Sequence, residues 1–103
     1  MALTAFLSVT DHTATIELAG ELDSGSAPKL HRVIEEALRS DISCLELQAT
    51  ELTYMSSAGL RALLFARQKL GDDGSVIMLG APQEVARTVR LAGLEASIKL
   101  ADT

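Results

Sequence analysis

Two adjacent serines are the residues of this sequence whose type and position best suit chemistry. Ser56 and Ser57 stand before Ala58, Gly59 and a leucine-rich run with helical spacing. The first turn of a helix has free backbone N–H groups and the positive end of the helix dipole, so it accommodates a phosphate of about −1.5 to −2 charge. Serine is also a preferred N-cap residue and contributes about 1 kcal/mol there. The residues alone leave both roles open, capping and phosphorylation.

The other reactive side chains form no catalytic or metal-binding pattern. His12 and His31 belong to no HExxH motif and lie near no CxxC pair, and the sequence has neither a GxSxG elbow nor a GxxxxGKS/T phosphate loop. The single cysteine, Cys44, lies in a predicted strand and is expected to be an unreactive core thiol. We therefore expect a protein that is not an enzyme and has no metal site and no cofactor.

Composition and charge narrow the classes of partner. The chain has 103 residues, 48% hydrophobic and 22% charged, which predicts one folded domain over residues 1–103. A net charge of −5 and an aromatic content of 3% argue against a nucleic-acid partner. No apolar run approaches the roughly 18 residues of a membrane span, and the first basic residue, Lys29, comes too late for a signal peptide. We expect a cytoplasmic monomer with no membrane partner.

The spacing of apolar residues predicts the elements that position the serines. Asp11-His12 is expected to be the turn of an N-terminal hairpin, after which strands and helices alternate. Strands joined through a helix run parallel, so the order ββαβαβαβ predicts an α/β fold with a mostly parallel, mixed sheet of four to five strands and helices packed against it. Strands are predicted at 3–9, 13–18, 42–47, 76–79 and 98–100, and helices at 27–38, 60–70 and 82–92.

Two segments follow the carboxyl ends of strands, where functional loops of such sheets tend to lie. These are residues 20–26, where Ser24 or Ser26 can cap a helix, and residues 53–59, which contain the serine pair. The core faces of the second and third helices are expected to carry Leu60, Leu63, Leu64 and Leu70, and Val85, Val89 and Ala92, respectively. Arg67 falls on the leucine side, so we expect it to reach solvent from the rim of the core.

Two segments of the chain resemble the STAS domain of bacterial anti-sigma factor antagonists. They are Gly20-Glu21-Leu22-Asp23 and Leu52-Thr53-Tyr54-Met55-Ser56-Ser57-Ala58-Gly59-Leu60. The serine-containing segment after an aromatic–Met pair is fairly specific to the family, and the first segment is weaker but correctly spaced from it. The resemblance covers essentially the whole chain, including its length and its order of strands and helices.

The resemblance implies a regulatory switch. In that family a serine of this segment is phosphorylated by a cognate serine kinase that is also the anti-sigma factor, and a PP2C-type phosphatase reverses the reaction. The unphosphorylated antagonist binds the kinase and frees the sigma factor. The resemblance places the acceptor on Ser57, with Ser56 as the alternative, since Ser56 stands where many members have Asp. Ala58 replaces a common Ser or Thr, and Gln48 replaces a common Asp.

The partner-binding surface implied by the resemblance comprises Asp23, Ser56, Ala58, Gly59, Arg61 and Phe65. The roles of three of these residues stay open. Asp23 either orients the serine or the nucleotide-binding end of the kinase, or is an acid whose charge is favourable at a helix terminus. Phe65 is an exposed partner contact or packs at an edge, and Arg61 pairs with a partner acid or the phosphate, or is solvated. Two alternatives remain for the whole chain: an unphosphorylated scaffold or transport accessory subunit, and the same switch acting on secretion or motility.

Overall fold

The chain begins with a hairpin and then alternates helices with strands. A computed structural model describes residues 2–102, and its element order is the predicted ββαβαβαβ. The elements are β1 (Thr4–Thr10), β2 (Thr13–Leu22), α1 (Ala27–Ala37), β3 (Cys44–Met55), α2 (Ser57–Leu70), β4 (Ser75–Leu79), α3 (Gln83–Leu91) and β5 (Lys99–Ala101).

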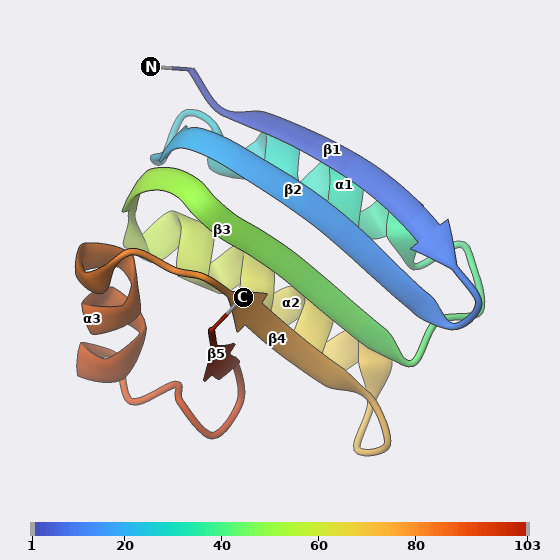
Figure 1. Cartoon of the computed structure of the whole chain (residues 1–103). Coiled ribbons are helices and arrows are strands. Elements are labelled where there is room, and N and C mark those ends of the chain that lie inside the picture. Colours follow the sequence, from blue (N-terminus) through green and yellow to red (C-terminus); the bar gives the residue numbers. More distant parts are fainter. Residues whose placement is uncertain (1, 103) are drawn as a thin grey trace.

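The five strands form one mixed sheet in the order β1-β2-β3-β4-β5. Strand β1 pairs antiparallel with β2, and every later pair is parallel, as crossovers through helices require. In Figure 1, α1 and α2 lie behind the sheet, while the near face of β1, β2 and β3 carries no helix. The carboxyl ends of β2 and β3 lie side by side and lead into α1 and α2, so the two segments predicted to carry function meet at one edge of the fold.

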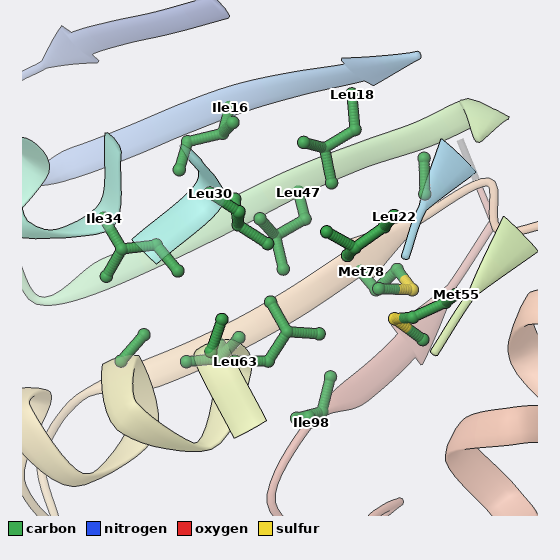
Figure 2. Close-up of a cluster of buried hydrophobic side chains, with 14 of the residues drawn as sticks. Ile16, Leu18, Leu22, Leu30, Ile34, Leu47, Met55, Leu63, Met78 and Ile98 are labelled. Atoms are coloured by element: carbon green, nitrogen blue, oxygen red, sulfur yellow. The ribbon is translucent and has the colours of Figure 1, made fainter. Parts of the chain in front are cut away.

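The core lies between the sheet and its helices. Alternating residues of β2 (Ala14, Ile16 and Leu18) are buried, as predicted from the period of two. Figure 2 shows how side chains of β2, β3 and β4 meet those of α1 and α2 in this core. All buried side chains among the described residues are apolar, and each large one contributes about 1.5–3 kcal/mol through removal from water.

Strands β2 and β3 run further than the sequence predicts. Strand β2 ends at Leu22, not at residue 18, and β3 continues to Met55, although the strand was expected to end at residue 47 and residues 53–59 to form a loop. The register explains the discrepancy. Glu17 pairs with Gln48 but Ala19 pairs with Glu51, and one further shift follows before Met55, so β3 twice holds an extra residue. Each bulge interrupts the alternation of apolar and polar residues, and this alternation is the pattern from which a strand is predicted.

The helices confirm most, but not all, of the predicted core. Leu60 and Leu63 of α2 and Val85 and Val89 of α3 are buried. Two expectations are wrong, since Leu64 lies at the margin of the buried stripe and Ala92 is the exposed C-cap of α3. Leu70 is partly buried and packs against the core, as expected. The two helices also bury Ala62, Ala66 and Ala86.

The end of α2 is held by Arg67, a half-buried residue at the rim, as expected. Its guanidinium donates to the carbonyl oxygens of Gly71 (2.7 Å) and Gly74 (2.6 Å). Gly71 has a φ of 75°, a conformation that glycine adopts without steric cost. Arg67 thus ties the turn that follows α2 back to the helix whose first turn carries the serines.

Candidate functional site

Ser56 is the single residue between β3 and α2. Its backbone N–H donates to the carbonyl oxygen of Leu22 at 2.8 Å, which ties the end of β2 to the start of α2. Its backbone is extended, and its hydroxyl oxygen accepts from the N–H of Gly59 at 3.3 Å. Ser56 is therefore the N-cap of α2, and the predicted loop at 53–59 reduces to this one residue.

Ser57 is the first residue of α2 and is exposed. Its hydroxyl makes no hydrogen bond within residues 2–102, in contrast to that of Ser56. The first turn of α2 contains no acidic residue, so the positive end of the helix dipole is not offset there. The two adjacent serines thus differ in their surroundings: one hydroxyl is engaged in the helix cap and the other is free.

Gly59 is buried under the end of β2. A Cβ at this position would lie 2.6 Å from Leu22 Cγ and 3.2 Å from Met55 Cγ, closer than side chains pack. Gly59, which is expected among the partner contacts, has a packing role that the sequence does not announce. Its absent side chain lets the first turn of α2 pack directly on β2 and β3.

Asp23 follows β2 directly and forms a closed motif with Ser26, the residue at the N-cap position of α1. Its Oδ1 accepts from the Ser26 backbone N–H at 2.9 Å, and its own N–H donates to the Ser26 Oγ at 3.0 Å. Hydrogen bonds from the Ser26 backbone and then from its hydroxyl lower the pKa of Asp23. Ser26 makes no side-chain cap of its own, and its hydroxyl instead donates to the Glu21 carbonyl oxygen at 2.9 Å.

An open groove of about 430 Å³ lies between α1 and α2, next to the serine pair. Helix α2 contributes Ala58, Arg61 and Phe65 to it, and Arg61 is exposed. The Phe65 ring is half-buried and stacks on His31 of α1, with ring centroids 4.2 Å apart. Phe65 therefore packs at the edge between two helices while it also lines the groove. The remaining lining residues are Ser24, Ala27, Pro28, His31 and Ala62.

Sequence reasoning missed two parts of this region. His31 belongs to no motif, and its partner Phe65 is 34 positions later, so no local pattern announces their stack. Tyr54 is 51% exposed at the end of β3, close in sequence to the serines. Thr53 and Tyr54 are consecutive and both exposed because a register shift of β3 falls between Leu52 and Tyr54, and the sequence alone does not reveal such a shift.

No helix in residues 2–102 is long and apolar enough to span a bilayer. No group of three or more His, Cys, Asp or Glu side chains in this range is placed to hold a metal ion.

Comparison with known proteins places this geometry in a family. The family model described as the STAS domain matches residues 6–103. The "Anti-sigma-B factor antagonist" of Listeria monocytogenes is 30% identical over 92 residues, which cover 88% of this chain and 80% of the relative.

Solved structures show the same fold. An anti-sigma factor antagonist from Mycobacterium paratuberculosis matches with a TM-score of 0.89 at 22% identity, covering 99% of this chain and 87% of that one. The antagonist SpoIIAA in its unphosphorylated form matches with a TM-score of 0.81 at 24% identity, covering 97% and 88%. The Bacillus SpoIIAA structure in the phosphorylated form gives 0.72 at 24% identity, covering 97% and 91%. These matches confirm the predicted α/β architecture.

Proposed function

The chain belongs to the STAS domain family, and from that premise we propose that it is an anti-sigma factor antagonist switched by phosphorylation of Ser57. The unphosphorylated chain binds an anti-sigma factor that is also a serine kinase. The kinase transfers the γ-phosphoryl group of ATP to the Ser57 hydroxyl and then releases the chain. A PP2C-type phosphatase restores the binding form by hydrolysing the phosphoserine. The chain itself supplies only the acceptor, with residues 1–103 acting as one domain.

The observation that carries this proposal is the difference between the two serines. Ser57 is exposed and its hydroxyl has no partner among the described residues, whereas Ser56 uses its hydroxyl oxygen to cap α2. A kinase has to reach the acceptor oxygen from solvent, which favours Ser57. A solved relative of the same fold, SpoIIAA, exists in an unphosphorylated and a phosphorylated form, the pair of states that the proposal assigns to this chain.

The same position explains how a phosphate can act without refolding the chain. A phosphate on the first residue of α2 faces free N–H groups and meets no acidic side chain in the first turn, so the helix tolerates it. In a docked complex, however, the negative charge of the phosphate lies within the interface, where it either loses its water without gaining a partner or faces other negative charges. A penalty of about 3–4 kcal/mol lowers affinity by roughly 10²–10³-fold, which is enough to release a partner.

The docking surface extends from Ser57 along the groove between α1 and α2. Ala58 and Phe65 provide its apolar part, and Arg61 provides an exposed charge one turn beyond the acceptor. Aromatic and arginine side chains at such positions often dominate binding energy. Asp23 lies beside this surface, directly after Leu22, whose carbonyl oxygen accepts the Ser56 N–H.

Phosphosite mapping tests the proposal. The purified chain is incubated with ATP and the anti-sigma serine kinase from the same genome, and the product is measured by intact mass and peptide mapping. We expect one phosphoryl group on Ser57, none in Ser57→Ala, and continued modification of Ser56→Ala. Modification at Ser56 or elsewhere would overturn the assignment. A chain that is never modified would favour the alternative of an unphosphorylated scaffold.

A further inference from the structure

A second hollow lies on the other side of the sheet from α1 and α2. It is an open groove of about 680 Å³ over β1, β2 and β3, the face that no helix covers in Figure 1. Its lining includes Phe6, Glu17, Gln48, Thr50 and Glu51. The first bulge of β3 helps to shape it, because Thr50 and Glu51 are consecutive and both exposed, where a regular strand would bury one of them.

This sheet groove is acidic and has an aromatic wall. Glu17 and Glu51 are exposed and have no ion-pair partner in the part of the chain that the structure describes. No Lys, Arg or His side chain lines the groove. The Phe6 ring is 67% exposed, and Phe6 is directly opposite Glu17 in the register of β1 and β2. A cation placed between these two side chains would meet a carboxylate and the face of an aromatic ring together.

We propose that the sheet groove binds an extended segment of a partner protein that presents Arg or Lys at alternate positions. Glu51 of β3 pairs with Ala19 of β2, and Glu17 lies two residues before Ala19 on β2. Glu17 and Glu51 are therefore on neighbouring strands with an offset of two residues. Strand spacing and rise put these two positions about 8 Å apart. Side chains on one face of an extended segment repeat every two residues, about 6.8 Å, so successive cations can reach both carboxylates.

The two grooves differ in charge, which indicates that the sheet groove and the serine site bind different partners. The groove between α1 and α2 is lined by the exposed Arg61, whereas Glu17 and Glu51 are the charged residues that line the sheet groove. A second copy of this chain would bring another acidic face, and a nucleic acid would bring phosphates, so both are repelled from the sheet groove. A basic protein segment is the occupant that fits, and it can bind while the serine site is occupied. This inference goes beyond the proposed switch and does not depend on it.

Binding of a defined peptide tests the inference. The probe is a fluorescein-labelled nonapeptide of alternating arginine and valine, compared with the same peptide carrying the neutral isostere citrulline in place of arginine. Fluorescence anisotropy measures affinity, and amide chemical shifts of the ¹⁵N-labelled chain locate the site. We expect shifts in β1, β2 and β3, and at least tenfold weaker binding of the citrulline peptide.

Matched variants separate the groove from general charge attraction. Glu17→Gln with Glu51→Gln removes two carboxylates from the groove and is expected to weaken arginine-peptide binding about tenfold, with a smaller, about threefold, loss for Phe6→Ala. Glu36→Gln with Asp73→Asn makes the same change in net charge on exposed positions elsewhere and is expected to change affinity less than twofold.

Three results would overturn the inference: equal binding of the arginine and citrulline peptides, equal losses in the two double variants, or shifts confined to α1 and α2. Phosphoserine at position 57 is expected to leave peptide affinity within twofold. A failed peptide assay together with a working kinase switch would therefore reject the sheet groove alone, and the reverse combination would reject the switch alone.

Discussion

Gly59, in the first turn of α2, packs against Leu22 at the end of β2, with no room for a side chain between them. The Ser56 N–H bonds to the Leu22 carbonyl oxygen in the same place, so one residue of β2 meets both the N-cap and the first turn of α2. The position of the serine pair is thus set by contact with the core and not by a free loop. This makes the site rigid before any partner arrives.

A methyl group at Gly59 tests this close packing. We predict that Gly59→Ala lowers the free energy of unfolding by about 1–3 kcal/mol, because its Cβ would lie 2.6 Å from Leu22 Cγ and force a shift. Urea denaturation followed by circular dichroism measures the loss. The matched control is Gly25→Ala, whose Cβ would meet only Asp23 Oδ1, at 3.5 Å, and which we expect to change stability by less than about 0.5 kcal/mol. Equal losses would show that Leu22 is not the constraint.

The two serines are predicted to differ in their contribution to stability. Ser56→Ala removes the cap on the Gly59 N–H and is expected to cost about 1 kcal/mol. Ser57→Ala removes an exposed hydroxyl with no described partner and is expected to cost less than about 0.5 kcal/mol. Chemical denaturation measures the free energy of unfolding of both variants, which carry the same Ser-to-Ala substitution at adjacent positions. A larger cost at Ser57 would contradict the assignment of the cap.

Phosphorylation is predicted to leave the fold in place. Phosphoserine incorporated at position 57 adds negative charge at the start of α2, where the helix dipole contributes about 0.3–1 kcal/mol of stabilisation. We expect the thermal midpoint to stay the same or rise slightly, and amide chemical shifts to change only near the start of α2. Widespread shift changes through the sheet would instead indicate a switch by refolding.

The motif at Asp23 is predicted to make stability depend on pH in acid. Hydrogen bonds from Ser26 lower the pKa of Asp23 in the folded state, so the folded chain binds this proton less readily than the unfolded chain does. The stabilisation is present above the unfolded pKa of about 3.9 and is lost as pH falls through the lower folded value. Unfolding free energies of wild type and Asp23→Asn should therefore converge below about pH 4. Asp72→Asn, which makes the same change in charge at an exposed position in the turn after α2, serves as the control variant.

Much of the fold is predictable from residue spacing, and the failures have physical causes. The period of two in residues 13–18 and the helical stripes at Leu30 and Ile34 give correct elements because each residue's burial follows local geometry. In the first half of β3, Leu45, Leu47 and Ala49 are buried at alternate positions, but in the second half the buried residues are Ala49, Leu52 and Met55, a spacing of three that suits neither a regular strand nor a helix. Bulges against β2 produce this spacing, and only the paired strand can reveal them.

The candidate site is likewise predictable from the sequence only in part. Local sequence identifies the serine pair as the start of a helix, and family resemblance assigns Ser57 as the acceptor. The sequence does not divide the two hydroxyls between capping and exposure, because that depends on how Leu22 fixes the Ser56 backbone. The contact between His31 and Phe65 also joins distant segments, so the groove beside the serines becomes visible only once α1 and α2 are packed together.

The affinity of the kinase for the two forms of the chain tests the central claim most directly. Isothermal titration calorimetry would compare the unmodified chain with the chain carrying phosphoserine at position 57, and Ser57→Ala would serve as the form that cannot be modified. We predict that phosphoserine weakens binding roughly 10²–10³-fold, while Ser57→Ala binds like the unmodified chain. Equal affinities of the phosphorylated and unmodified forms would contradict the account.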